Sequence, residues 1–178
     1  MIHRLFIAID PPDSIRSSIH SICGGMKKVK WVTEDQIHLT IRFIGDIDEL
    51  VFKNICQGLS TLKPISFLLK VQDLGHFPLR GNPKVLWAGV EENRELVKLY
   101  KSVNSVVESC RLEPEHRKFS PHITLGRIKG ESVETIAEYL RFHSKFKTPS
   151  FDVLEYHLYS SILTPDGAIH EKIATFQF

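Results

Sequence analysis

The stretch His38-Leu39-Thr40-Ile41 has the same pattern as His122-Ile123-Thr124-Leu125, and this repeat decides how the chain is interpreted. Alternate side chains of a strand share a face, so each histidine is expected beside its threonine, with the apolar residues pointing the other way. Chance would supply roughly 0.07 matches to this pattern in a chain of this composition. Two buried strand histidines satisfied by their neighbours are the simpler alternative, and we weigh it as the less favoured one.

The residues around the two motifs predict an α+β protein made of two similar lobes. Expected strands cover 5–9, 29–32, 38–44, 67–71, 85–90, 122–128, 153–163 and 169–178, and expected helices begin at 13, 48, 93 and 133. Strands 67–71 and 85–90 are expected to pair. The motif histidines lie 122 − 38 = 84 residues apart, about half of the 178-residue chain. We therefore expect one bilobal domain over 1–178, with pseudo-twofold duplicated β-α-β units whose antiparallel sheets face a central groove.

Composition excludes several classes of protein. The chain is 42% apolar with a net charge of +2, which is too balanced for a nucleic-acid binder that works by bulk charge. Its 3 cysteines, an odd number without a close pair, argue against a disulfide framework and a thiolate zinc site. The N-terminal apolar stretch 5–9 is too short for a signal or a membrane span. We expect a cytoplasmic monomer with no membrane partner.

Paired histidines and threonines indicate chemistry on a phosphate. One imidazole can accept a proton while the other donates one near neutral pH. Threonine hydroxyls can hold the phosphoryl oxygens while charge moves between the attacking and leaving oxygens. We expect no metal and no cofactor. No His-x-His or His-Glu-x-x-His spacing is present, and a phosphate in a strained cyclic diester can be opened by proton transfer from histidine without a Lewis acid. The two histidines are expected to titrate as a coupled pair with a bell-shaped rate profile.

Further segments match a known family: residues 5–10, 29–32, 43–45, 77–78, 85–87, 121–127, 158–161 and 165–167, together with both motifs. On these residues the chain closely resembles the RNA 2′,3′-cyclic phosphodiesterases of the two-histidine phosphoesterase superfamily, also called 2′-5′ RNA ligase-like proteins. The resemblance implies a bilobal fold and metal-independent hydrolysis of a 2′,3′-cyclic phosphate, on an RNA 3′ end or a nucleotide, to a 2′-phosphate. It also implies that His38 is the proton donor and His122 the proton acceptor.

By the same resemblance Thr40 and Thr124 grip the phosphate, and Arg127 matches an arginine that follows the second motif. Alternation from His122 puts Arg127 on the opposite face, so a bulge or a strand end is required for it to reach the site. Relatives usually place a tyrosine three residues after Gly167, where this chain has His170.

Other side chains are weaker candidates. Trp31 and Phe77 can stack a base but are more often core residues at such positions, and Trp87 is assigned to the core. A basic rim for phosphates is expected from Arg42, which alternation places on the face of Thr40, with Lys27, Lys28, Lys30, Arg80, Arg117, Lys118 and Lys129. The other histidines, His3, His20, His76, His116, His143, His157 and His170, are expected at surfaces or caps.

Three functions remain open. The leading one is an RNA 2′,3′-cyclic 3′-phosphodiesterase. The second keeps the site but acts as a 2′-5′ RNA ligase or on a small cyclic nucleotide, because loops rather than motifs set the substrate. The third is a module that holds RNA ends without turnover.

Overall fold

A computed structural model describes residues 3–164 and 167–178, so Pro165 and Asp166 of the last matching segment lie outside the described residues. Its elements in chain order are β1 (His3–Ile9), α1 (Asp13–His20), β2 (Val29–Trp31), a 3-10 turn (Glu34–Gln36), β3 (Leu39–Ile47), α2 (Glu49–Ser60), β4 (Phe67–Leu69), β5 (Val71–Phe77), β6 (Val85–Val90), α3 (Arg94–Ser109), β7 (His122–Ile128), α4 (Val133–Phe142), β8 (Phe151–Val153), β9 (Glu155–Thr164) and β10 (Gly167–Gln177). The predicted α+β class is confirmed.

The main sheet has two halves, and all of its strand pairs are antiparallel. The strand order is β10-β9-β1-β3-β7-β6-β5. In addition β2 pairs with β7 along the edge opposite to β6. The first half, β10-β9-β1-β3, meets the second at β3 and β7, where Leu39 pairs with Ile123. Both residues are about 1% exposed. The junction between the halves therefore lies inside the two motifs, and the histidines flank it.

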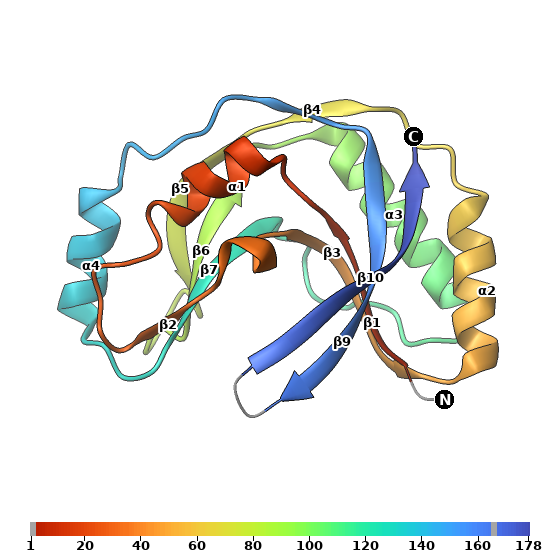
Figure 1. The fold of residues 1–178 in the computed structure, drawn as a ribbon, viewed down its shortest axis with the longest axis horizontal. Coiled ribbons are helices and arrows are strands. Elements are labelled where there is room, and N and C mark those ends of the chain that lie inside the picture. Colours follow the sequence, from red (N-terminus) through yellow and green to blue (C-terminus); the bar gives the residue numbers. More distant parts are fainter. Residues whose placement is uncertain (1–2, 165–166) are drawn as a thin grey trace.

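Helices cover the two halves in pairs. Figure 1 shows α1 and α4 beside β5, β6 and β7, and α2 and α3 beside β1, β3 and β10. Helices α2, α3 and α4 begin where the sequence supplies a cap: the side chains of Asp48, Asn93 and Ser132 accept backbone N–H bonds from the first turn. Every third or fourth residue of α3 is buried, as an amphipathic helix requires: Leu96, Leu99, Val103 and Val107.

The predicted pairing of strands 67–71 and 85–90 is correct only at Val71, which pairs with Val90. Phe67–Leu69 pairs with β8, and β6 pairs with β5, which extends to Phe77. Gly75 looks like a turn residue in the sequence, but here it makes room within a strand: a Cβ would lie 2.3 Å from Cζ2 of Trp87. The glycine admits the indole across the sheet rather than ending β5.

Both motif strands carry a β-bulge at the same place. On β3, Ile7 pairs with Arg42 while Ala8 pairs with Thr40, so Ile41 is an extra residue. On β7, Leu86 pairs with Gly126 and the next residue of β6 pairs with Thr124, so Leu125 is extra. A bulge reverses which face the following side chains point to. It therefore changes the placement of the residues that directly follow each motif.

In the part of the chain that the structure describes, no helix is long and apolar enough to cross a membrane. Cys23, Cys56 and Cys110 are free thiols and half-buried.

Candidate active site

The register at the sheet junction brings the two motifs together on one face. Continuing the pairing of Leu39 with Ile123 by one residue in each direction places His38 across from Thr124. By the same symmetry Thr40 lies across from His122. The two histidines are then diagonal neighbours, and Cα atoms in such a pair lie about 7–8 Å apart. We call this side of β3 and β7, opposite to buried Leu39 and Ile123, the site face.

Each imidazole is held by the same local bond. Nδ1 of His38 lies 2.7 Å from the carbonyl oxygen of Gln36, and Nδ1 of His122 lies 2.7 Å from that of Ser120. A carbonyl only accepts, so Nδ1 carries the proton and donates it in both rings. Among the described residues neither Nε2 atom bonds to another protein group, so a ring that carries its proton on Nδ1 alone offers a lone pair at Nε2. This is the arrangement that two facing proton-transfer groups need.

The threonine hydroxyls between the rings are unused within the protein. Across residues 3–164 and 167–178, neither Oγ1 of Thr40 nor that of Thr124 bonds to another protein group. Both side chains are half-buried on the site face. Two hydroxyl donors therefore lie beside two imidazoles, as the alternation of each motif predicts.

Aromatic rings support both histidines from the neighbouring strands. His38 packs against Phe6 of β1, with ring centroids 5.0 Å apart, and against Tyr159 of β9 at 6.3 Å. His122 packs edge-on to Phe77 of β5 at 4.9 Å and lies 6.5 Å from Trp87 of β6. Each half thus places its imidazole against a pair of aromatic rings, close to parallel for His38 and edge-on or tilted for His122.

His38 differs from an exposed histidine in its titration. Burial lowers its pKa from 6.5 to about 4, against the hydrogen bond to Gln36, which raises it. Charges on His170 and His122 lower this pKa further, while the Asp10 carboxylate raises it. His38 is therefore neutral at pH 7 until a bound anion compensates for its burial.

Behind His38 lies a small pocket of about 140 Å³. Its lining residues come from β1, the 3-10 turn and the β9–β10 hairpin: Asp10, Asp35, Gln36, His38, Tyr159, Ala168, Ile169 and His170. His170 lies edge-on to His38 with centroids 5.6 Å apart, and its Nδ1 is buried without a hydrogen-bond partner among the described residues. The prediction that His170 lies at the surface or a cap is wrong; it belongs to this pocket.

Asp10 anchors the far wall of the pocket. It accepts hydrogen bonds from the Tyr159 hydroxyl at 2.6 Å and from Lys172 Nζ at 2.8 Å. Burial raises the pKa of Asp10, but these two bonds together with the charges of His157 and Lys172 lower it more, so the net pKa lies below the usual range. His157 is 1% exposed, with Nε2 3.6 Å from Asp10. It is therefore not the surface or capping histidine that the sequence predicts.

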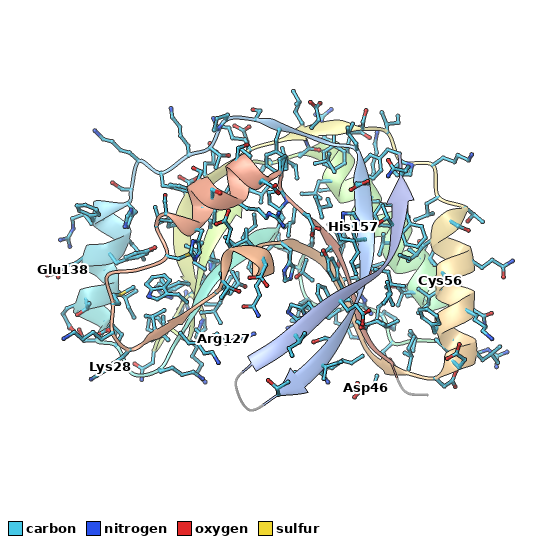
Figure 2. The ribbon with its side chains drawn as sticks, in the orientation of Figure 1. Lys28, Asp46, Cys56, Arg127, Glu138 and His157 are labelled. Atoms are coloured by element: carbon cyan, nitrogen blue, oxygen red, sulfur yellow. The ribbon has the colours of Figure 1, made fainter. Side chains whose placement is uncertain are left out.

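The bulge at Leu125 gives Arg127 the placement that simple alternation denies it. Because the bulge adds one residue, Arg127 returns to the face of His122 and Thr124, where it is exposed. Figure 2 shows it on the half of the molecule that carries β2 and β7. Gly126 makes this possible, because a Cβ there would meet Val29 Cγ1 at 2.7 Å.

The corresponding bulge on β3 makes the prediction wrong that Arg42 lies on the face of Thr40. The bulge at Ile41 turns this side chain away from the site face, and it is only 7% exposed. Its guanidinium donates to the carbonyl oxygen of Glu113 and lies 3.5 Å from the Glu115 carboxylate. Arg42 thus ties β3 to the segment after α3 and is no part of a phosphate rim. The other predicted rim residues are exposed: Lys27, Lys28, Lys30, Arg80, Arg117, Lys118 and Lys129.

Of the three aromatic residues considered from the sequence, Phe77 and Trp87 lie near His122 and Trp31 packs elsewhere. Trp31 donates its indole N–H to the Met26 carbonyl and packs on Tyr139, away from the histidines. Phe77 lies at the site against His122. Trp87, assigned to the core, is half-buried and pairs with Thr124 across β6 and β7. Among the described residues no group of three or more His, Cys, Asp or Glu is arranged to hold a metal ion.

Known proteins share both the sequence and the fold. The chain matches the family LigT like Phosphoesterase over residues 9–87 and 89–170. A protein of Archaeoglobus fulgidus named RNA 2′,3′-cyclic phosphodiesterase is 33% identical over 177 residues, which cover 98% of this chain and 99% of the relative. One of the same name from Aquifex aeolicus is 36% identical over 154 residues, covering 83% and 80%.

Among solved structures, E. coli LigT complexed with 3′-AMP superimposes with a TM-score of 0.82 at 26% identity, covering 99% of this chain and 98% of that chain. A protein described as a phosphoesterase superimposes with a TM-score of 0.83, also at 26% identity, over 99% and 98%. A match that runs from one end to the other in sequence and in fold means that the chain belongs to the LigT-like phosphoesterase family.

Proposed function

We propose that this protein hydrolyses the 2′,3′-cyclic phosphodiester at RNA 3′ ends to a 2′-phosphate, with His38 as proton donor and His122 as proton acceptor. The observation that carries the proposal is the pair of Nδ1-protonated imidazoles on adjacent strands of one face, with threonine hydroxyls between them. Relatives named RNA 2′,3′-cyclic phosphodiesterase support the substrate. The LigT structure with 3′-AMP supports a nucleotide ligand in this fold.

The proposed reaction is one in-line displacement at phosphorus. Nε2 of His122 accepts a proton from water as the water oxygen bonds to phosphorus. The bond from phosphorus to the 3′ oxygen breaks, and Nε2–H of His38 gives its proton to that oxygen. The products are a 3′ hydroxyl and a 2′-phosphate. After the step Nε2 of His122 carries a proton and Nε2 of His38 does not. Proton exchange with solvent restores the starting state of both rings.

The low pKa of His38 is compatible with its role as donor only when substrate is bound. The phosphodiester anion favours the imidazolium beside it and offsets the burial that disfavours charge in the free protein. The donor is therefore charged in the complex and neutral in the empty site. Asp10 acts in the same direction as the substrate, since its carboxylate also raises the pKa of His38.

The remaining site groups bind the phosphate. Thr40 and Thr124 donate hydroxyl hydrogen bonds to its non-bridging oxygens, and Arg127 supplies positive charge from the same face. The step needs no metal or cofactor, because the five-membered ester is strained and His38 protonates the leaving oxygen. Every group comes from one chain, so a monomer is sufficient as the functional unit.

The test is product analysis with a short oligoribonucleotide that ends in a 2′,3′-cyclic phosphate. We expect ³¹P NMR to show conversion to a 2′-phosphate at catalytic enzyme concentration, unchanged by a chelator, and lost in His122→Ala. A nucleoside 2′,3′-cyclic phosphate measures the first alternative activity. A mixture of RNA ends carrying a 2′,3′-cyclic phosphate and a 5′-hydroxyl measures the second, because the 5′-hydroxyl can take the place of water, displace the 3′ oxygen and leave a 2′-5′ linkage. Tight, salt-sensitive binding without ring opening would contradict the proposal and favour a binding module.

A further inference from the structure

The pocket behind His38 gives this imidazole a second side that the reaction on the site face does not use. Its volume of about 140 Å³ has room for several waters, and its lining is rich in polar groups. One wall is His170 of β10, whose ring stands edge-on to His38 with centroids 5.6 Å apart. The pocket is therefore a polar space between a reacting imidazole and a second imidazole.

His170 is fixed in place and yet has a polar atom to spare. Its ring packs edge-on against Phe6 at 4.8 Å as well as against His38. The side-chain amide of Gln36 donates to the Ala168 carbonyl oxygen at 3.0 Å and so ties down the strand that carries His170. Nδ1 of His170 is nevertheless buried with no hydrogen-bond partner among the described residues. A buried nitrogen is costly unless it bonds to water or to a ligand, so this atom calls for a role in the pocket.

The proposed reaction requires a proton to reach His38 after the substrate has bound. In the free protein this ring is neutral at pH 7, because burial lowers its pKa to about 4. It becomes the charged donor only beside the phosphodiester anion. The bound substrate then covers the site face, so the proton has to arrive from another side of the ring. The pocket is such a side.

Carboxylates stand at both ends of a path through the pocket. Burial lowers the pKa of both rings, but Asp35 raises that of His170 and Asp10 raises that of His38. Asp35 is an exposed residue of the 3-10 turn, so its end of the path is the one that meets solvent. A charge on His170 lowers the pKa of His38, which disfavours a proton on both rings at once. This arrangement favours the passage of one proton over the storage of two.

We propose that His170 is a proton relay that charges His38 through water in the pocket while the substrate is bound. The proposal rests on the proposed function, in which His38 is the proton donor. His170 takes up a proton from solvent or a buffer acid and becomes an imidazolium. It then gives the proton on Nδ1 to a pocket water as that water gives one to Nε2 of His38, and exchange with solvent restores its starting tautomer. One proton enters and one leaves, so no other reactant is consumed.

The residue type at this position fits the proposal. Relatives usually carry a tyrosine where this chain has His170. An imidazole has an ordinary pKa of about 6.5, against about 10 for a phenol, and therefore takes up and releases protons more readily near neutral pH.

Chemical rescue tests the relay during turnover. His170→Phe keeps a flat ring against Phe6 but removes both nitrogens. In dilute buffer at mildly alkaline pH we expect it to lower kcat for a cyclic-phosphate oligonucleotide by about 100-fold, the lower end of what a positioned proton-transfer group contributes, with KM nearly unchanged. Added imidazole should restore kcat in a saturable way, because it carries a proton and has the size of the missing ring. The kcat of wild type should not depend on imidazole concentration.

Two further variants separate a relay from a structural role. His170→Gln keeps a polar side chain in the pocket but does not titrate, so it should be as slow as His170→Phe. His143 follows α4, and burial lowers its pKa as well, so His143→Gln is the matched control and should keep the kcat of wild type. A loss of kcat in His170→Phe that imidazole does not restore, or no loss at all, overturns the relay.

A second measurement does not depend on hydrolysis. The probe is a nucleoside 2′-phosphate, whose negative charge should keep His38 protonated in the complex. In protein labelled at histidine, ¹⁵N NMR follows the exchange of the Nε2 proton of His38 with water. We expect this exchange to be about 100-fold slower in His170→Phe than in wild type, and faster again with imidazole. If exchange slows in this way but wild type does not hydrolyse the cyclic phosphate, the proposed function fails and the relay stands. If hydrolysis occurs and exchange is unchanged in His170→Phe, the relay fails alone.

Discussion

Gly126→Ala is expected to damage both the stability and the activity of this protein through the bulge on β7. A Cβ at this position would lie 2.7 Å from Val29 Cγ1, 3.1 Å from the Lys30 carbonyl oxygen and 3.2 Å from Trp31 Cε3. Val29 is 7% exposed and cannot swing into solvent, and a backbone carbonyl cannot rotate away. The substitution therefore pushes β2 off β7, which pair at this residue.

The magnitude follows from overpacking. Forcing a methyl group into a filled interface costs about 1–3 kcal/mol. For a chain of this length each kcal/mol lowers Tm by about 2–4 °C, so we expect a drop of about 2–12 °C. Arg127 is the next residue, and it moves with the strand. Gly126→Ala can therefore lower kcat/KM no more than Arg127→Gln does. Loss of one charge-assisted contact lowers it by at most about 150-fold.

Thermal unfolding and steady-state hydrolysis of a cyclic-phosphate oligonucleotide measure the two effects. Gly24→Ala is the matched control, because a Cβ at Gly24 has no atom within 4 Å. Its Tm and kcat/KM should equal those of wild type. Wild-type melting and full activity in Gly126→Ala would refute the claim that close packing at this bulge positions Arg127.

Further predictions concern the site itself. Thr40→Val and Thr124→Val keep side-chain shape and break no hydrogen bond made among the described residues, so each should lower kcat by about 100-fold with an unchanged Tm; equal rates would contradict their role as phosphate donors. Asp10→Asn removes a carboxylate that raises the pKa of His38, so a smaller fraction of the proton donor is charged at a given pH and kcat/KM at pH 7 should fall; an unchanged value would contradict this. Because the folded-state pKa of His38 is depressed from 6.5 to about 4, its contribution to stability is complete above 6.5 and lost as pH falls toward 4. Denaturant titrations should therefore show the free energy of unfolding of wild type falling by up to about 3 kcal/mol more than that of His38→Gln over that window, and parallel pH dependences would contradict it.

Much of the fold could be predicted from the sequence because its signals are local. Strand β7 has the predicted bounds, α4 begins at the predicted residue 133, and α2 follows its Asp48 cap. Alternation within each motif correctly puts the histidine and threonine of that motif on one side of the strand. Such signals depend only on neighbours along the chain.

The errors share a physical cause, which is that they depend on partners far away in sequence. Counting alternate residues from Thr40 puts Arg42 at the site, because it does not include the bulge at Ile41. Trp87 resembles a core residue until its pairing with Thr124 is known.

The sequence does not predict the pocket beside His38, because the pocket depends on which strands pair with one another. His170 reaches it because β10 pairs with β9, which pairs with β1. Asp10 joins it through a bond to Tyr159, 149 residues away. The departure at position 170 from the residue usual in relatives was the one sequence signal for this pocket.

The claim that His38 and His122 act in a single step is tested most directly by single-turnover rates of His38→Ala, His122→Ala and the double variant. Each single change should slow opening of the cyclic phosphate by about 10²–10⁴-fold, and the double variant should be about as slow as the worse single one, because either loss disables the same transition state. A folded single variant that opens the ring at the wild-type rate would contradict the account.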